Sequence, residues 1–330
     1  MKIAIMTVPF LPQLGGVETV VALLSRELVK LGCEVKVATM TPSSQKDSFS
    51  YEVIRQPGWK KTWQTWWWAD AVLLQGLTLR MGWPALFCSK PCLITHHMML
   101  DQPQHIGVVR RILLARSHSV SVSHAVARSL PVPSTVIQNP YNAEIFHNHD
   151  NENPDRDLVF VGRLCADKGA DLLLSALQLL AGKNIKPTLT IVGDGKERPA
   201  LEAQVRKLGL EKQVQFTGAV AKMPLARILQ NHRIMVIPSR CEEGFGIVAL
   251  EGIACGCAVI GSSGGGLPEA IGLCGVVFPK GDAVALAEKI EMYLKQPELS
   301  EECQRNGANH LAIHEPATIA QKYLKRLTSG

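Results

Sequence analysis

The sequence lacks the features that would place it in several large classes of protein. It has no run of about eighteen apolar residues, which a membrane-spanning helix would need. Its start, Lys2 followed by the strand-like Ile3-Ala4-Ile5-Met6, contains no signal-peptide cleavage site. We therefore expect the chain to stay in the cytoplasm, where it could also lie peripherally on the inner face of the membrane.

A metal-binding or disulfide framework is also missing. The nine cysteines are odd in number, and the spacings Cys88 to Cys92 and Cys255 to Cys257 match no zinc pattern. The pair His96-His97 has no third ligand at a suitable spacing. Asp155-Arg156-Asp157 has the form D-x-D, but it precedes a predicted strand instead of following one. We expect reduced cysteines and no metal.

The size and composition predict two packed domains. The chain has 330 residues, of which 46% are hydrophobic and 19% charged, and a length of this order suits two domains of about 150 residues. The polar stretch 147–157 is the predicted boundary between residues 1–150 and 151–312. Residues 1–150 hold 14 Lys or Arg and 9 Asp or Glu, which is +5 of the net +6. This bias suits an acidic membrane surface, a phosphorylated acceptor or ordinary solubility.

The N-terminal pattern predicts a β-loop-α-β unit. Residues 2–8 read as a buried strand, Gly15-Gly16 opens an amphipathic helix that runs to Leu31, and a strand follows over Glu34 to Thr39. Such a unit predicts a parallel sheet with a ligand at the carboxyl ends of its strands. Two adjacent glycines do not form the dinucleotide motif G-x-G-x-x-G, and they can also be a simple helix cap.

The most informative stretch runs from Pro238 to Gly272. Glu251 is the only charged residue between Gly244 and Pro268, so a buried helix is predicted whose carboxylate needs a partner. Glu243 lies eight positions earlier, and the turn Gly244-Phe245-Gly246 separates the two acids where the helix should begin. Backbone N–H groups and the positive helix end at this point suit a diphosphate. Two carboxylates on either side would accept hydrogen bonds from ribose and from a sugar.

These residues resemble the E-x7-E signature of the retaining glycosyltransferases of family 4, here Glu243 to Glu251. Pro238-Ser239 and the run from Gly265 to Glu269 fit the same pattern. The resemblance implies an α/β fold of the GT-B type, with two Rossmann-like domains of parallel sheets that face each other across a deep cleft. Residues 1–150 would bind the acceptor, residues 151–312 would bind the nucleotide sugar, and a C-terminal helix in 313–330 would cross back onto the N-terminal domain.

The resemblance also assigns roles to individual residues. Gly162-Arg163 and Lys168-Gly169 match a family pattern whose cations hold the diphosphate; without that pattern they would read as a solvated loop. The residues implied as catalytic are His97, Arg163, Lys168 and Glu243. The residues implied in donor binding are Gly15, Gly16, Arg163, Lys168, Gly193, Val220, Glu243, Phe245, Gly246, Ile247 and Glu251.

The implied activity is the transfer of a hexosyl group, with retention, from a nucleoside-diphosphate sugar to a hydroxyl of a glycan or lipid-linked acceptor. UDP is the favoured nucleotide and GDP the next; the product would belong to cell-envelope polysaccharide or glycoconjugate synthesis. Neither a metal, a cofactor nor a nucleic acid is expected to take part. Two alternatives stay open, a non-hydrolysing sugar-nucleotide epimerase and a non-catalytic scaffold that binds nucleotide sugar.

Residues 57–68 hold five of the six tryptophans beside Lys60 and Lys61. Indole rings with lysine heads suit a lipid headgroup layer. The predicted strand from Ala71 follows immediately, so some of these rings should instead pack on the sheet. A peripheral membrane contact and a core role are both open for this segment.

Overall fold

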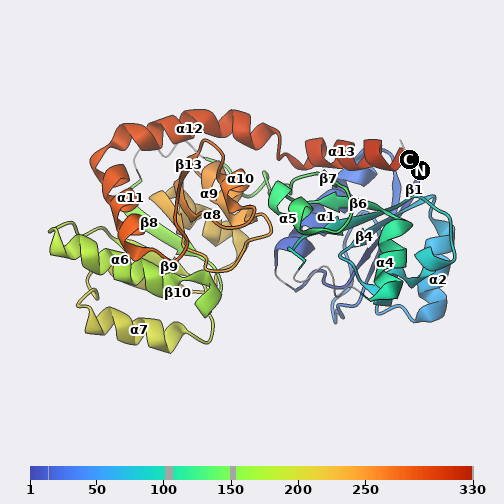
Figure 1. Cartoon of the computed structure of the whole chain (residues 1–330), viewed down its shortest axis with the longest axis horizontal. Coiled ribbons are helices and arrows are strands. Elements are labelled where there is room, and N and C mark those ends of the chain that lie inside the picture. Colours follow the sequence, from blue (N-terminus) through green and yellow to red (C-terminus); the bar gives the residue numbers. More distant parts are fainter. Residues whose placement is uncertain (14, 101–106, 149–153, 329–330) are drawn as a thin grey trace. The chain divides into compact units, whose positions relative to one another are not determined.

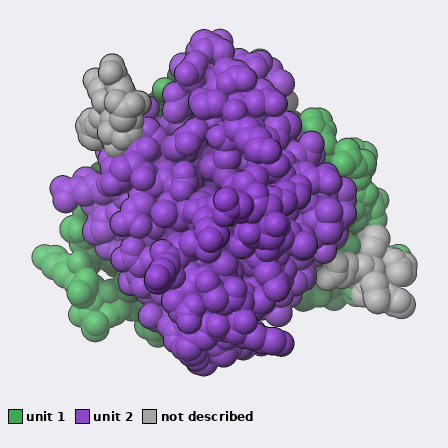
Figure 2. All heavy atoms as spheres, turned by 90° about the vertical axis from the view of Figure 1, so that its left-hand side faces the viewer, with its two compact units in different colours: residues 1–142, 314–330 green, residues 143–313 purple. Residues whose placement is uncertain are grey.

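The computed structural model describes residues 1–13, 15–100, 107–148 and 154–328, which form two compact units. Unit 1 consists of Met1–Asn142 together with His314–Gly330, and unit 2 of Ala143–Ile313; Figure 2 draws them in green and purple. The predicted boundary between residues 150 and 151 lies outside the described residues.

Unit 1 is a seven-stranded parallel sheet with helices on both faces (Figure 1). Its strands are β1 (Lys2–Thr7), β2 (Glu34–Thr39), β3 (Glu52–Arg55), β4 (Ala71–Gln75), β5 (Cys92–His96), β6 (His118–Ser121) and β7 (Ser134–Val136). Its helices are α1 (Gly16–Lys30), α2 (Trp59–Trp68), α3 (Leu79–Gly82), η1 (Trp83–Leu86), α4 (Val108–Ala115), α5 (His124–Ser129) and α13 (Pro316–Thr328). The strand order is β3-β2-β1-β4-β5-β6-β7.

The alternation of side chains along β1 divides the core of unit 1 between the two faces of the sheet. Ile3 and Ile5 pack with residues of α1 and α13, whereas Ala4 and Met6 pack with residues of α2, η1 and α4. Because successive side chains of a strand point to opposite faces, one wholly apolar strand supplies both cores.

The last helix of the chain belongs to the first unit. Ile319, Tyr323 and Leu327 of α13 are buried in the same core as Ile3 and Ile5. The Tyr323 hydroxyl lies 3.2 Å from the Thr95 hydroxyl at the centre of the sheet. The helical spacing of these apolar residues thus serves a docked helix.

Unit 2 is a six-stranded parallel sheet, also covered by helices on both faces (Figure 1). Its strands are β8 (Arg156–Val161), β9 (Leu189–Val192), β10 (Val214–Gly218), β11 (His232–Ile237), β12 (Ala258–Ser262) and β13 (Gly275–Phe278). Its helices are η3 (Ala166–Lys168), α6 (Ala170–Gly182), α7 (Arg198–Lys207), α8 (Lys222–Gln230), α9 (Ile247–Ala254), α10 (Leu267–Ile271), α11 (Ala283–Lys295) and α12 (Pro297–Ala312). The strand order is β10-β9-β8-β11-β12-β13.

Each sheet reverses its winding direction once. In unit 1 the reversal falls between β1 and β4, and in unit 2 between β8 and β11. The loops that follow the two strands at such a point diverge, so they leave a crevice at the carboxyl ends of the strands, where open α/β sheets bind ligands. The predicted α/β class with two parallel sheets is confirmed, and it directs attention to these two positions. Within the described ranges, no helix is both long and apolar enough to span a bilayer.

Candidate functional site

Two predicted site residues meet at the reversal point of unit 2. Lys168 ends η3 shortly after β8, and Glu243 lies in the loop after β11. The Lys168 Nζ donates a hydrogen bond of 2.6 Å to Glu243 Oε1, which also accepts one of 2.6 Å from the Ser239 hydroxyl. The side chains of Lys168 and Glu243 are 26% and 17% exposed, so both groups are ordered by partners and still reach solvent.

Glycines bring the loops of this site into direct backbone contact. Gly169 has a φ of +69°, and a Cβ there would lie 2.0 Å from the Pro238 carbonyl oxygen. Gly265 has a φ of +62°, and a Cβ there would lie 2.1 Å from the Glu243 carbonyl oxygen. The Gly266 N–H donates to that same oxygen at 2.7 Å. Only glycine fits such contacts in this backbone region, so the loops on both sides fix the position of Glu243.

The start of α9 adjoins this loop. Gly246 is its N-cap residue with a φ of +97°, its first turn carries no acid, and no described side chain caps it. The Phe245 side chain is buried beneath the turn. An uncapped helix start with glycine at the turn favours an anion, since N–H groups and the positive end of the helix dipole point toward it.

Glu251 lies on the second turn of α9 and is half-buried. Burial raises the pKa of its carboxyl to about 7, and the charge of Lys222, at the start of α8, partly opposes that rise. Burial in turn lowers the pKa of Lys222. The sequence predicted that this carboxylate needs a partner but did not identify Lys222. The charge of Lys222 acts on Glu251 because α8 and α9 both contact β11.

Glycines lie at the carboxyl ends of the three neighbouring strands β8, β9 and β10. Gly193 follows β9 with a φ of +137°, and a Cβ there would lie 1.9 Å from the carbonyl oxygen of Gly162, which follows β8. The Gly193 N–H donates to the carbonyl of Gly218, the last residue of β10, at 2.9 Å. The half-buried Val220 comes two residues later. This edge of the sheet is therefore lined by main chain that a ligand can approach closely.

The two arginines near this edge differ in their contacts. Arg163 is exposed, and its guanidinium forms no hydrogen bond or ion pair with another described residue. Arg240, in the loop after β11, forms a two-pronged ion pair with Asp171 at 2.6 and 2.7 Å. Hydrogen bonding to Arg240 lowers the pKa of Asp171. Arg240 thus fastens the Glu243 loop to α6, whereas Arg163 keeps its charge available to a ligand.

Unit 1 presents a second polar pair at the carboxyl ends of β4 and β5, next to its own reversal point. His97, just after β5, places Nε2 2.7 Å from Oε1 of Gln75, the last residue of β4. Burial lowers the pKa of His97 to about 4, with a further contribution from His96. Among the described residues, neither His97 Nδ1 nor Gln75 Nε2 has a hydrogen-bond partner. Gln75 was not anticipated from the sequence, because only the pairing of β4 with β5 brings it beside His97.

The Gly15-Gly16 loop of unit 1 differs from the turn before α9. Glu18 in the first turn of α1 is 6% exposed, and a Cβ on Gly15 would lie 2.4 Å from its Oε2. A carboxylate therefore already lies at the positive end of α1. Of the two helix starts, that of α9 is electrostatically better suited to a phosphate.

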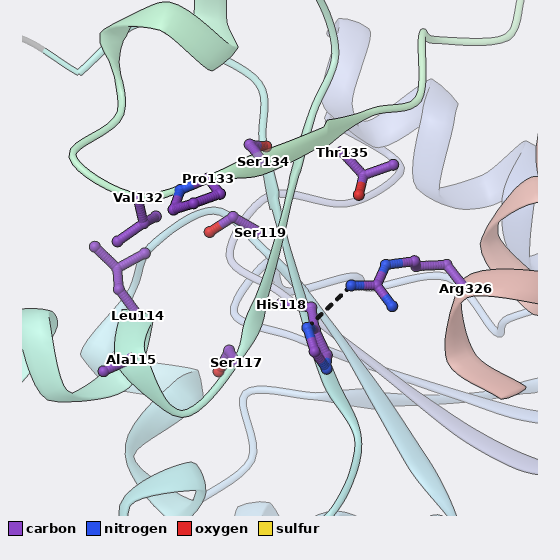
Figure 3. A pocket seen from close by; sticks show the side chains of 10 residues that line it. All are labelled: Leu114, Ala115, Ser117, His118, Ser119, Val132, Pro133, Ser134, Thr135 and Arg326. Carbon is purple, nitrogen blue, oxygen red and sulfur yellow. Dashed lines mark hydrogen bonds between the residues drawn. The ribbon is translucent and has the colours of Figure 1, made fainter. Parts of the chain in front are cut away.

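A separate cavity of about 390 Å³ lies at the opposite edge of the unit 1 sheet, where β6 and β7 begin (Figure 3). Arg326 of α13 reaches into it and places a guanidinium nitrogen 3.0 Å from His118 Nδ1. None of the predicted site residues lines this cavity. In the described part of the chain, no three His, Cys, Asp or Glu residues are grouped to hold a metal ion.

Comparison with known proteins places this site in a family. A family model described as "Glycosyl transferases group 1" matches residues 142–310, a little over half of the chain. The uncharacterized glycosyltransferase MJ1178 of Methanocaldococcus jannaschii is 32% identical over 56% of this chain and 51% of that protein. The lipopolysaccharide core biosynthesis mannosyltransferase LpcC of Rhizobium leguminosarum bv. viciae is 27% identical over 92% of this chain and 89% of that protein. The chain spans about half the length of MJ1178 and less of several other relatives, such as 40% of the alpha-D-kanosaminyltransferase of Streptomyces kanamyceticus.

Solved structures resemble the whole chain. Anabaena Alr3699/HepE in complex with UDP has a TM-score of 0.82 at 20% identity, with complete coverage of both chains. WaaG, a glycosyltransferase involved in lipopolysaccharide biosynthesis, has a TM-score of 0.72 at 17% identity, with 99% of this chain and 100% of that chain covered. At these identities the likeness concerns the fold, which is that of the GT-B glycosyltransferases.

Proposed function

This chain belongs to the glycosyl transferases group 1 family, and on that premise we propose that it is a retaining family 4 enzyme. It transfers a hexosyl group from a nucleoside-diphosphate sugar to a hydroxyl of a glycan or lipid-linked acceptor. The observation that carries the proposal is the Lys168–Glu243 ion pair at the reversal point of unit 2, beside the uncapped start of α9.

The donor is assigned to this edge of unit 2. Glu251 accepts hydrogen bonds from the ribose hydroxyls, and the main chain at Val220 and Gly193 lies along the nucleoside. The N–H groups of Phe245, Gly246 and Ile247 face the diphosphate, whose charge Arg163 and Lys168 balance. Glu243 accepts hydrogen bonds from hydroxyls of the hexose.

The ion pair gives donor binding a sequence of events. In the structure the Lys168 ammonium pairs with the Glu243 carboxylate at 2.6 Å. An incoming diphosphate offers the Lys168 ammonium a stronger, doubly charged partner. When Lys168 moves to the diphosphate, the Glu243 carboxylate becomes free to accept hydrogen bonds from the hexose. The diphosphate, which later becomes the leaving group, therefore releases Glu243 to bind the hexose.

Chemistry then consists mainly of stabilising the leaving group. The bond between the anomeric carbon and the diphosphate oxygen breaks while Arg163, Lys168 and the start of α9 stabilise the charge on that oxygen. The acceptor hydroxyl oxygen forms the new bond on the face that the diphosphate leaves, and its proton passes to the departing oxygen. This route needs no covalent glycosyl-enzyme and no cofactor.

UDP is the favoured donor nucleotide and GDP the next. The structural neighbour Alr3699/HepE was crystallised with UDP and with UDP-glucose, which supports the first choice. LpcC is named for lipopolysaccharide core biosynthesis, and this supports an acceptor in cell-envelope glycans. We assign the acceptor to unit 1, and we propose that His97 takes part in catalysis and that Gly15 and Gly16 take part in substrate binding. We also assign residues 57–68 to a peripheral membrane contact.

The test has two stages. Thermal shifts with UDP, GDP and ADP identify the base, and the matching sugar nucleotides are then assayed for transfer to added glycan acceptors. NMR of the product gives the anomeric configuration. We expect donor-dependent transfer with retention; inversion or a trapped glycosyl-enzyme would overturn the mechanism. Epimer formation without an acceptor would identify an epimerase, and donor binding without turnover would identify a scaffold.

A further inference from the structure

Exposed aromatic side chains and cations share the outer side of one helical layer of unit 1. The layer consists of α2, η1 and α4, and η1 contacts both of the other helices. Its inner side is buried against the sheet through Trp66, Ala85 and Leu113. The exposed side chains of these elements therefore point away from the sheet, and we call their surface the aromatic-basic face.

Four aromatic rings form a continuous row across this face. Trp67 stacks on Trp63 at 6.3 Å between ring centroids, Trp63 on Trp83 at 5.7 Å, and Trp83 meets the edge of Phe87 at 6.2 Å. The row joins α2 to η1 and is held by ring contacts, yet Trp67 is 68% and Phe87 72% exposed. Trp59, at the start of α2, is 70% exposed. A row fixed in this way offers apolar surface with little conformational entropy left to lose on binding.

Helix α4 extends the apolar surface beyond the aromatic row. Val108 is 73% exposed, and Val109 and Ile112 are also exposed. The Arg116 guanidinium donates a hydrogen bond to the Leu86 carbonyl and so ties the end of α4 to η1. Large apolar side chains that face water over three neighbouring elements mark an interaction surface.

The charge of this face is mainly positive. Residues 57–90 and 107–116 contain seven Lys or Arg and one acid, Asp70. Lys60, Lys61, Arg110 and Arg111 are exposed beside the apolar side chains. Lys90 caps the end of α2 through three carbonyls and lies over the Trp67 ring at 5.4 Å. The face thus accounts for the positive bias of residues 1–150.

We propose that the aromatic-basic face docks unit 1 onto the surface of an anionic lipid bilayer. Indole rings and short apolar side chains insert at the headgroup level, and the cations meet the lipid phosphates. A second copy of the chain would bring two positively charged faces together, and an apolar protein partner would offer no charge complementary to the cations. The inference deepens the proposed function, on which its use for a lipid-linked acceptor rests, but the binding itself needs no turnover.

The chain provides its own optical probe for this proposal. All six tryptophans lie between residues 59 and 83, so tryptophan emission reports on this layer alone. We expect a blue shift with vesicles of phosphatidylcholine and phosphatidylglycerol, quenching when the acyl chains carry bromine, and reversal by salt. Vesicles of pure phosphatidylcholine should give a much weaker response.

Matched variants separate the contributions. Arg110→Gln with Arg111→Gln should weaken partitioning by tenfold or more, because each cation near such a surface contributes about fivefold. Trp59→Ser with Phe87→Ser should lower binding to both kinds of vesicle. The control carries Lys207→Gln, Lys212→Gln and Leu273→Ser, which change exposed cations and an exposed leucine of unit 2, and it should bind as the wild type does. Circular dichroism checks that every variant folds.

Three outcomes would overturn the proposal: equal binding to neutral and anionic vesicles, equal loss in the control variant, or no vesicle binding by a chain that transfers sugar to a water-soluble acceptor. The proposal would also be overturned if the chain did not bind vesicles but formed a dimer that the same substitutions dissociate. That result would identify a second copy of the chain as the occupant of the face. If the chain binds anionic vesicles but transfers no sugar, the docking inference holds and the proposed function fails.

Discussion

Lys168 Nζ lies 2.6 Å from Glu243 Oε1 although 75 positions separate the two residues in the chain. The contact joins the loop after β8 to the loop after β11, where the winding of the unit 2 sheet reverses. The cation and the carboxylate thus lie together at the carboxyl edge of the sheet. A ligand that binds one of them would free the other to bind a second part of the same ligand.

Removing either partner of this pair should impair turnover more than stability. We expect Lys168→Ala and Glu243→Ala each to lower kcat at least tenfold, about 1.4 kcal/mol, and to change the free energy of unfolding by at most about 1 kcal/mol because the pair is partly exposed. Lys183→Ala is the matched control, since Lys183 pairs with Glu291 at 2.7 Å away from the site. Wild-type kcat in either site variant would remove that residue from the mechanism.

The ionisation of Glu251 should set the pH dependence of donor binding. Burial raises its pKa from 4.5 to about 7, so the carboxylate that accepts ribose hydroxyls is lost as the pH falls below about 7. We expect Kd for the sugar nucleotide to rise across that range. Glu251→Gln should weaken binding about tenfold at pH 8 and abolish this dependence, whereas the exposed control Glu302→Gln should preserve it.

The same shift predicts the opposite effect on the stability of the unliganded chain. Between pH 4.5 and about 7 the folded state binds more protons at Glu251 than the unfolded state does. The free energy of unfolding therefore decreases as the pH rises through this window. Glu251→Gln should raise the melting temperature at pH 8 and leave it nearly unchanged at pH 4.5; a lower melting temperature at pH 8 would contradict the burial of a costly charge.

His96, which is buried, and His97, which is half-buried, should make unit 1 sensitive to acid. Burial lowers the pKa of His96 and of His97 to about 4 from 6.5, so the unfolded state takes up protons first as the pH falls from 6.5 to 4. Stability is lost over that window, by up to about 3 kcal/mol for each histidine. Urea unfolding followed by tryptophan emission, which reports unit 1, should show this loss, and His97→Gln should reduce it. The exposed His118→Gln serves as control.

Two glycines with similar backbone angles, Gly265 and Gly209, should differ in how well they tolerate substitution by alanine. Gly265→Ala places a Cβ 2.1 Å from the Glu243 carbonyl at a φ of +62°, whereas Gly209→Ala at +69° meets open space. The second change should cost about 1 kcal/mol for the left-handed backbone alone. The first should cost several times as much and should also lower donor affinity, because the Glu243 loop must move. Equal losses in urea unfolding would refute the close contact.

Local patterns predicted the elements of the fold but not their neighbours. The apolar run at residues 2–8 and the helix after Gly15-Gly16 follow from periodicity and glycine placement, and they occur as β1 and α1. Arg163, Lys168 and Glu243 follow strands, so a common carboxyl edge was foreseeable for them. The sheet order that brings the loops of β8 and β11 together is set by long-range pairing, which no local pattern encodes.

The residues that the sequence did not reveal lack a motif of their own. Gln75 ends an ordinary apolar strand and is significant only because β5 pairs beside it. Lys222 starts an ordinary helix and gains its role from Glu251 on another one. The tryptophans of residues 57–68 divide between core and surface, with Trp66 buried and Trp59 and Trp67 exposed. Contact with Trp83, distant in sequence, holds part of the group at the surface.

The return of α13 to unit 1 affects the order in which the protein can mature on the ribosome. Unit 2 is continuous in the sequence and can fold as soon as residue 313 has emerged. The sheet of unit 1, which is translated first, then still lacks the helix α13 that completes its core. Until residues 316–328 arrive, α1 alone covers Ile3 and Ile5, and the part of this core that α13 completes stays exposed to water. Loss of residues 316–328 would therefore expose apolar side chains of the sheet that the first strands form.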